Sequence, residues 1–148
     1  MDTYATLNDV LVNLFHDVVA LENQAVTTGE YQDITNNDMH VIEAIGIGEP
    51  KNMSTIAKEL SVTVGTLTIA MNSLVKKGYV LRERGREDRR VVYISLSEKG
   101  RSVYRSHETF HRQMIDAMLK DLTQDETESL VTALAKLKQW FRKGEEIS

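Results

Sequence analysis

Apolar residues recur at helical spacing in the first part of the chain. Between residues 7 and 25 they fall mostly three or four positions apart and therefore share one face, which predicts a long amphipathic helix. Thr27, Thr28 and Gly29 are expected to end it. A second helix is predicted from about Asn37 to Ile45, before the sequence GIGEP. The apolar positions of the first helix are Leu7, Val10, Leu11, Leu14, Phe15, Val18, Leu21 and Ala25.

Two shorter helices with a tight turn between them are predicted next. Asn52 is a suitable N-cap for a helix that runs through Leu60, and Thr63 for one from about Val64 to Lys77. Gly78 is a suitable residue to follow the second helix. The two helices and their turn form a helix-turn-helix pattern. The side chains expected to face inward are Ile56, Ala57, Leu60, Leu67, Met71 and Leu74.

Two strands and two more helices complete the pattern. The sequences YVLRER and VVYISL, with Gly85 in their connection, predict a β-hairpin or wing. A helix is expected over roughly 98–119, and a capping box of Thr123 and Glu126 begins the last one. The last helix carries an apolar face of Leu130, Leu134, Leu137 and Phe141, with Trp140 beside it. The predicted fold class is therefore mainly α with a small β-hairpin wing, a winged helix-turn-helix.

The first and last helices carry wide apolar stripes that a lone winged helix cannot cover. We therefore expect residues 1–34 and 98–148 to form a helical dimerisation region in a symmetric homodimer, and residues 35–97 to form the DNA-binding domain. The alternative is that these helices fold back on their own chain.

Composition narrows the class of protein. The 148 residues suit one compact domain with helical extensions, and 41% are hydrophobic. No apolar run approaches the roughly 20 residues of a membrane span, and the first ten residues do not form a signal peptide. The absence of cysteine excludes disulfides, thiolate metal sites and cysteine nucleophiles. A cytoplasmic protein without a membrane partner is expected.

Charge is concentrated in one segment of this acidic chain. Residues 76–90 hold seven basic and three acidic residues, a net charge of +4, whereas the other 11 basic and 19 acidic residues give −8. A local basic patch on an acidic body indicates a docking surface for a polyanion, with a solvated loop as the alternative.

The helix after the turn has small polar residues on its non-core side, as a DNA-reading helix requires. Taken without the wing, this pattern is better explained by the alternative, an ordinary exposed helix face that is polar. Asn72 is a candidate for an adenine edge, near the limit of the helix's reach. An arginine-rich wing beside it would reach the minor groove, and Asp88 is expected to hold Arg90 in a bidentate pair. The candidate DNA-binding residues are Ser54, Thr63, Gly65, Thr66, Thr68, Asn72, Lys76, Arg82, Arg84, Arg86, Asp88, Arg89 and Arg90.

The segment NMSTIAKELSVTVGTLTIAMNSLVKKGYVLRERGREDRRVVYISLSEKG carries a family resemblance. With its D-x-R wing signature (Asp88, Arg90), the following LSEKG and the flanking helices, the chain resembles the MarR family of bacterial transcription regulators. The resemblance implies a two-fold dimer that binds a palindromic operator and responds to a ligand near the junction of the dimer helices and the DNA-binding domain.

Within that family, DMHVIEAIG, VTVGTLT, NSLVKKGY and HETFH are similar to the branch that represses fatty-acid biosynthesis genes in streptococci. This similarity implies a repressor whose corepressor is a long-chain acyl group on acyl carrier protein, with no required cofactor. An acyl chain needs an apolar tunnel, although each candidate residue is equally suited to a filled core. The candidates for the ligand pocket are Leu14, Phe15, Val18, Met39 and Phe110.

Two further interpretations concern metal. The spacing of Glu22, His40, His107 and His111 is similar to a metal site in the zinc-responsive branch of the same family, although Met39 stands where that branch tends to place an acidic ligand. A buried polar cluster without metal is the alternative. Residues 107–111 also match the H-E-x-x-H string of zinc peptidases. That string is short and no third ligand is recognisable, so a regulator rather than an enzyme is expected.

Overall fold

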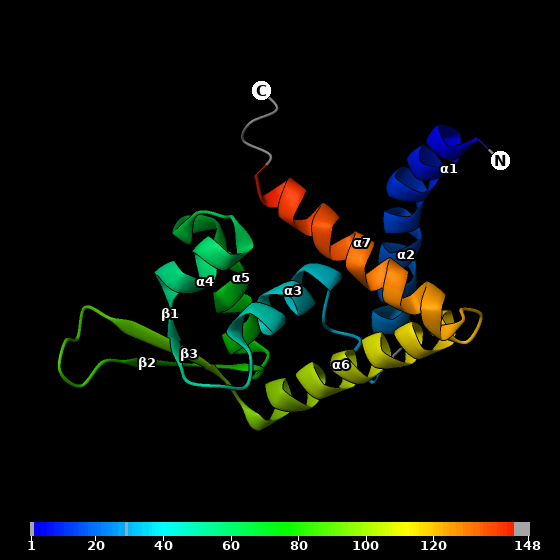
Figure 1. Cartoon of the computed structure of the whole chain (residues 1–148). Helices are drawn as coiled ribbons and strands as arrows, with labels where there is room; N and C mark the ends of the chain where they lie inside the picture. Colours follow the sequence, from blue (N-terminus) through cyan, green and yellow to red (C-terminus); the bar gives the residue numbers. More distant parts are fainter. Residues whose placement is uncertain (1, 29, 144–148) are drawn as a thin grey trace. The chain divides into compact units, whose positions relative to one another are not determined.

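The computed structural model describes residues 2–28 and 30–143. The described residues form two compact units, a first unit up to residue 108 and a second unit from residue 109, and the boundary falls inside the helix Glu98–Leu119. The elements in chain order (Figure 1) are α1 (Thr3–Asp9), η1 (Val10–Leu14), α2 (Phe15–Thr28), α3 (Asn36–Ile45), β1 (Lys51–Asn52), α4 (Met53–Leu60), α5 (Val64–Lys76), β2 (Val80–Arg84), β3 (Val92–Leu96), α6 (Glu98–Leu119) and α7 (Gln124–Arg142). The predicted division into residues 35–97 and a flanking dimerisation region stays a prediction.

The predicted first helix is present and is longer than its apolar repeat. It begins at Thr3, where the Asp2 carboxylate accepts a hydrogen bond from the Tyr4 N–H (3.0 Å), and it continues through the π-helical turn η1 to Thr28. The repeat located the apolar face but not the ends, because ends depend on capping groups outside the repeat. Gly29, the last of the three residues expected to end this helix, lies outside the described residues.

Helix α3 begins at Asn36, one residue before the prediction, because Thr35 and Asp38 form a capping box. The Asp38 N–H donates to Thr35 Oγ1 (3.1 Å), and the Thr35 N–H donates to the Asp38 carboxylate (3.0 Å). The same helix supplies much of the core of the first unit. The buried core residues are Ile34, Met39, Val41, Ile42, Ile45, Ile56, Ala57, Leu67, Met71, Leu74, Tyr79, Val80, Ile94, Leu96 and Val103.

The helix-turn-helix prediction is confirmed, including the residues that cap the N-termini of both helices. Asn52 Oδ1 accepts from the Thr55 N–H (2.8 Å) at the start of α4, and Thr63 Oγ1 accepts from the Thr66 N–H (3.1 Å) at the start of α5. Ser61 follows α4 in the left-handed region with a φ of 56°. Of the six side chains expected to face inward, five are buried and Leu60 is half-buried.

The wing is a three-stranded antiparallel sheet rather than a simple hairpin. Strands β2 and β3 form the predicted hairpin, and the structure gives their register, from Val80 opposite Leu96 to Arg84 opposite Val92. The two-residue strand β1 pairs with the other edge of β3, giving the order β1-β3-β2. Sequence reasoning missed β1 because two residues carry no alternation to recognise. The β2–β3 hairpin extends away from α4 and α5 (Figure 1).

The LSEKG sequence joins the wing to α6. Ser97 Oγ donates to the Gly78 carbonyl (2.6 Å) and accepts from the Gly100 N–H (3.1 Å), so one hydroxyl joins the end of α5 to the start of α6. A Cβ atom on Gly100 would lie 2.1 Å from the Tyr79 carbonyl oxygen. Glycine therefore permits the first turn of α6 to pack directly on the backbone that follows α5.

The second unit contains the end of α6 and the whole of α7. The predicted capping box is confirmed: Thr123 Oγ1 accepts from the Glu126 N–H (3.2 Å), and the Glu126 carboxylate accepts from the Thr123 N–H (3.0 Å). The Thr123 backbone donor holds the pKa of Glu126 below its usual value. Across the described residues, no helix is long and apolar enough to cross a membrane.

Candidate nucleic-acid interface

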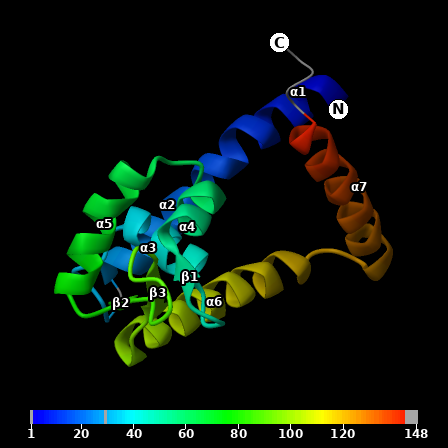
Figure 2. The ribbon, with the colours of Figure 1, turned by 90° about the vertical axis from the view of Figure 1, so that its left-hand side faces the viewer.

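Helix α5 lies at an edge of the first unit (Figure 2), with Leu67, Met71 and Leu74 buried beneath it. Hydrogen bonds inside the helix already use part of the polar surface that the sequence assigned to DNA. Thr63 is the N-cap and its hydroxyl also donates to Thr66 Oγ1 (3.0 Å), while Thr68 Oγ1 donates to the Val64 carbonyl (2.7 Å). The cap role of Thr63 was predicted from the sequence, whereas the bond of Thr68 to its own helix was not.

Gly65 lies in the first turn of α5 and is exposed. A Cβ atom built there would approach only the Thr63 hydroxyl, at 3.9 Å. Protein packing therefore does not require glycine at this position. The absence of a side chain leaves the backbone of the first turn open to a ligand.

Asn72 joins the reading helix to the wing. Its Oδ1 accepts a hydrogen bond from Arg82 Nη1 on β2 (2.6 Å). Bidentate pairing with an adenine edge uses both the oxygen and the nitrogen of the asparagine amide in one plane. The bond to Arg82 would therefore have to break, or the amide would have to rotate, before Asn72 could pair with adenine. The structure thus gives Asn72 a positioning contact with Arg82, which the sequence had not suggested.

The predicted pair of Asp88 and Arg90 is present at the end of the wing. Arg90 Nε and Nη2 each donate to one carboxylate oxygen of Asp88 at 3.1 Å, and the Arg90 backbone N–H donates to Oδ1 at 3.0 Å. The Arg90 guanidinium, and after it the backbone N–H, hold the pKa of Asp88 below its usual value. These bonds set the direction of a side chain that is 90% exposed.

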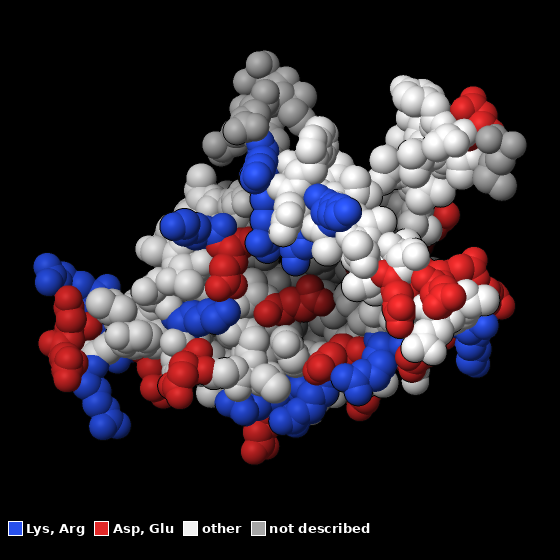
Figure 3. Space-filling model, viewed as in Figure 1, with Lys and Arg blue, Asp and Glu red and all other residues white. Residues whose placement is uncertain are grey.

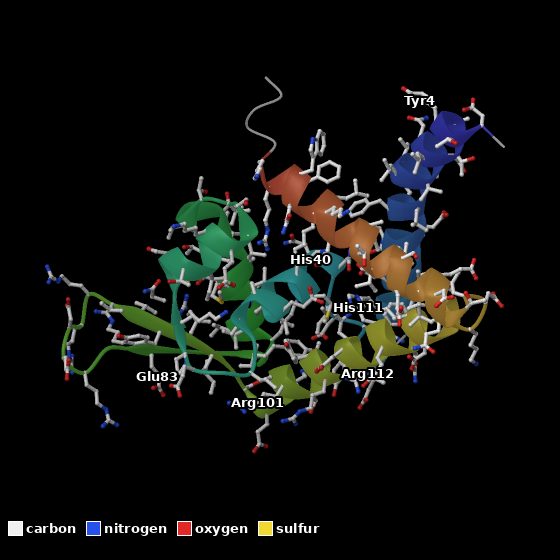
Figure 4. All side chains as sticks on the ribbon, viewed as in Figure 1. Tyr4, His40, Glu83, Arg101, His111 and Arg112 are labelled. Carbon is white, nitrogen blue, oxygen red and sulfur yellow. The ribbon has the colours of Figure 1, made fainter. Side chains whose placement is uncertain are left out.

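The turn of the wing is closed by backbone contacts. The Gly85 N–H donates to the Val91 carbonyl (2.8 Å), and a Cβ atom on Gly85 would lie 2.6 Å from the Asp88 carbonyl oxygen. Charged side chains of both signs gather at this free end and point outward from it (Figures 3 and 4). The other predicted contacts on α4, α5 and the wing are all exposed: Ser54, Thr66, Lys76, Arg82, Arg84, Arg86 and Arg89.

A polar clamp behind α5 was missed by sequence reasoning. The buried Tyr79 hydroxyl donates to the Asp33 carboxylate, and Lys77 Nζ donates to the Asp33 carbonyl (2.6 Å). Burial, and then the bond to Asp33, raise the pKa of Tyr79 far above its usual value, while the Tyr79 bond lowers the pKa of Asp33. Lys99 Nζ lies 4.2 Å from the centre of the Tyr79 ring. The clamp fixes the end of α5 against the segment before α3.

The four candidate metal ligands are distributed over both units. Glu22 and His107 are buried in the first unit, His40 is exposed on α3 (Figure 4), and His111 belongs to the second unit. Glu43, which sequence reasoning missed, reaches two of them: its carboxylate lies 2.6 Å from His107 Nε2 and 3.7 Å from His40 Nδ1. Its position three residues after His40 on one helix was the available signal.

The candidate ligand-pocket residues have different environments. Met39 is buried in the core, Val18 is half-buried, and Leu14 and Phe15 are 47% and 71% exposed. Phe110 lies in the second unit, where it is half-buried. A hollow of about 370 Å³ in the first unit has none of these five in its lining. It is lined by Asn37, His40, Val41, Glu59, Leu60, Val62, Thr66, Leu67 and Ala70.

A helix-turn-helix followed by an arginine-rich wing defines a class of DNA-binding regulators, the winged helix-turn-helix proteins. The family model for the transcriptional regulator SarA/Rot matches residues 27–107. The chain therefore belongs to the MarR/SarA family of winged helix-turn-helix transcriptional regulators.

Individual relatives agree with this assignment. The chain is 37% identical to the HTH-type regulator YwhA of Bacillus subtilis over 57% of this chain and 60% of that protein. It is 34% identical to the regulator SarZ of Staphylococcus haemolyticus over 69% of this chain and 68% of that protein. The crystal structure of Streptococcus pneumoniae FabT in complex with DNA matches with a TM-score of 0.90 and 34% identity, covering 95% of this chain and 98% of FabT.

These relatives are transcriptional regulators and not enzymes, so the prediction that the chain is a regulator rather than a zinc peptidase is confirmed. The H-E-x-x-H string lies on α6, and its first histidine, His107, is paired with Glu43. In a family of transcriptional regulators, the string does not mark a peptidase active site.

Proposed function

We propose that the chain is a homodimeric repressor that binds a palindromic operator and responds to a long-chain acyl group presented on acyl carrier protein. The observation that carries the proposal is the match to FabT, at 34% identity and a TM-score of 0.90 over 95% of the chain, in a structure where FabT is bound to DNA. A match of that extent includes α4, α5 and the wing, the elements on which DNA reading depends.

The proposed DNA contacts follow from the exposed surface of α5 and the wing. Helix α5 enters the major groove with Gly65 and Thr66 near its start, where the backbone is open. Arg90 enters the adjacent minor groove, directed by Asp88. A narrow minor groove attracts arginine because its negative potential is strongest there. The remaining wing arginines and Lys76 lie at phosphates, where each adds affinity that falls with salt.

Dimerisation is supported by apolar residues that the first unit leaves exposed. On α1, η1 and α2, Leu7, Leu11 and Leu21 are 53%, 54% and 47% exposed. Several large apolar side chains left exposed on one helical segment indicate a protein interface. In the second unit α7 has the same character. The exposed apolar residues of α7 are Leu130, Val131, Leu134, Leu137, Trp140 and Phe141. A second copy of the chain is the occupant that a two-fold symmetric operator requires.

The acyl effector is proposed from the resemblance to the fatty-acid branch together with the FabT match. An effector acts by binding one conformation of the dimer more tightly than the other. The factor by which the effector changes operator affinity then equals the factor by which the operator changes effector affinity. No cofactor is part of this proposal.

Zinc is the second candidate effector. The observation in its favour is the burial of Glu22 and His107 in the first unit, with the Glu43 carboxylate beside His107. Carboxylate and imidazole groups are suitable zinc ligands. The pairing of His107 with Glu43 equally satisfies both groups without a metal, which is why the acyl effector is placed first.

Fluorescence anisotropy distinguishes these functions. Labelled DNA from upstream of the chain's own gene and of fatty-acid biosynthesis genes is titrated in chelator, without and with long-chain acyl carrier protein, and then with zinc. Tighter binding with the acylated carrier in chelator is expected. Unacylated carrier is the control and should not change operator affinity. A response to zinc alone would replace the acyl effector with the metal, and no binding at low salt would overturn the repressor proposal.

A further inference from the structure

A large apolar side chain stands at the centre of the outward face of α5. Ile69 is 75% exposed, compared with 45% for Val64 on the same helix and 40% for Val62 in the turn before it. At about 100° per residue, Ile69 points away from the side that carries Leu67 and Met71. It plays no part in the core of the first unit.

Helix formation does not explain an isoleucine at this position. A β-branched residue has a lower helix propensity than alanine, leucine or lysine, which are all better choices for an exposed helical site. A single exposed apolar residue is ordinary on most surfaces. Here it occupies the middle of the surface that reads DNA in this fold class, so its chemistry bears on what is read.

The neighbours of Ile69 make room for a base edge. Gly65 lies one turn before it, and a Cβ atom there would meet only the Thr63 hydroxyl at 3.9 Å, so the surface beside Ile69 is open on that side. Asn72 lies almost one turn after it and is bonded to Arg82. Ile69 therefore projects between an open backbone and a side chain already positioned by the wing.

Hydrogen bonds within the protein already occupy several polar side chains on the surface around Ile69. The Thr68 hydroxyl donates to its own helix, Thr63 is the N-cap, and the Asn72 oxygen accepts from Arg82. Three of the polar residues predicted to contact DNA therefore already form hydrogen bonds with other protein atoms. In the major groove, the C5-methyl group of thymine is the feature of a base edge that suits an aliphatic side chain.

We propose that Ile69 is a specificity-determining residue that packs against the C5-methyl group of a thymine in each operator half-site. The inference rests on the proposed operator binding and deepens it by naming a base that α5 selects. Contact with Ile69 would remove apolar surface of both the side chain and the methyl group from water.

The test replaces single thymines of the operator with deoxyuridine, which removes the methyl group and leaves every hydrogen-bonding atom in place. Operator affinity is measured by fluorescence anisotropy for the wild type, Ile69→Ala and the control Ile47→Ala, whose isoleucine is 39% exposed in the loop after α3. Burial of one methyl group corresponds to an about fourfold change in affinity.

At one thymine per half-site, deoxyuridine should weaken wild-type and Ile47→Ala binding about fourfold and leave Ile69→Ala unchanged. Ile69→Ala should bind the natural operator at least fourfold more weakly than the wild type. Its thermal midpoint should not fall, because the replaced side chain is exposed and alanine favours helix.

Three outcomes would overturn the inference in different ways. The wild type could bind the operator while deoxyuridine at every position has the same effect on the wild type and on Ile69→Ala. The specificity role of Ile69 would then be wrong, and the proposed operator binding would stand. If the wild type binds no operator fragment, both proposals fail together. Equal loss of affinity in Ile69→Ala for thymine and deoxyuridine at every position would assign Ile69 to general contact rather than base selection.

Discussion

At the scale of single residues, Arg90 and Asp88 show how an exposed ion pair acts through direction rather than stability. Water screens such a pair, so it contributes little to the free energy of unfolding. The two side-chain bonds to Asp88 use two of the five N–H donors of the Arg90 guanidinium. They fix the plane of the group and so the direction of its three remaining donors. The acidic residue in a basic wing is therefore part of the DNA-facing geometry that we propose.

Replacing Arg90 with alanine should cost roughly 1–3 kcal/mol of operator affinity, the scale of losing one good groove contact. Asp88→Asn should act in the same direction and more weakly, because the bidentate carboxylate is lost while the guanidinium remains. Anisotropy titrations at several salt concentrations measure both effects, with Arg101→Ala on α6 as a charge-matched control (Figure 4). Unchanged affinity in Arg90→Ala, with the thermal midpoint preserved, would remove the wing from the interface.

Tyr79→Phe should lower the free energy of unfolding at pH 7 by about 1–2 kcal/mol, since the ring contacts remain and only the bond to Asp33 is lost. The lowered pKa of Asp33 means that its contribution is present above the unfolded pKa, near 4, and disappears as pH falls through the folded value. The raised pKa of Tyr79 means that its contribution is present below about pH 10 and disappears as pH rises through the folded value.

Urea unfolding of wild type and Tyr79→Phe at pH 7 and at acid pH measures this linkage. The difference between the two proteins should narrow on acidification. Tyr93→Phe, at a position 42% exposed on β3, is the control and should change stability by less than about 0.5 kcal/mol. A Tyr79→Phe difference that stays constant as Asp33 protonates would assign the loss to packing instead.

At the scale of elements, the caps and the apolar periods could be predicted because both are local. Asn52, Thr63 and Thr123 each bond to the backbone three residues ahead, so the sequence alone contains both partners. The start of α3 was placed one residue late because the capping box of Thr35 and Asp38 was not recognised. Strand β1 was missed because it exists through its pairing with β3, some 40 residues away.

The junction between α5 and α6 gives an element-scale prediction. Gly100→Ala should lower the free energy of unfolding by about 1–3 kcal/mol, because the new Cβ atom would lie 2.1 Å from the Tyr79 carbonyl oxygen and would force the two elements apart. Intrinsic helix propensity alone predicts the opposite sign, since alanine exceeds glycine by about 1 kcal/mol. Chemical denaturation therefore decides between them.

Gly48→Ala is the matched control for this change. A Cβ atom at Gly48 would meet nothing within 4 Å, so its stability should stay within about 0.5 kcal/mol of the wild type. If Gly100→Ala were as stable as Gly48→Ala, the direct packing of α6 on the Tyr79 backbone would not be a constraint on the fold.

At the scale of the whole molecule, the proposed homodimer depends on apolar side chains that neither unit buries by itself. Leu11 is 54% exposed on η1. Leu11→Glu should weaken dimerisation by roughly 3 kcal/mol or more, because symmetry removes two leucines and leaves two charges in the interface. Operator affinity should fall with it, since a monomer reads one half-site.

Light scattering coupled to size exclusion, over a range of protein concentrations, measures the change. Ile47→Glu places the same charge on an apolar residue of a loop and should leave the dimer intact. A wild type that is monomeric throughout the range would contradict the homodimer, and a fully dimeric Leu11→Glu would move the interface away from the first helix.

The sequence by itself determined the winged helix-turn-helix, its caps, the arginine wing and the pair of Asp88 with Arg90, because these depend on residues within a few positions of one another. Tertiary structure alone decided which polar groups meet across larger separations. Asn72 bonds to Arg82 ten residues on, Tyr79 bonds to Asp33 across 46, and Glu43 lies beside His107. Such pairs form only after the core has placed their helices and strands, since no local pattern favours one distant partner over another.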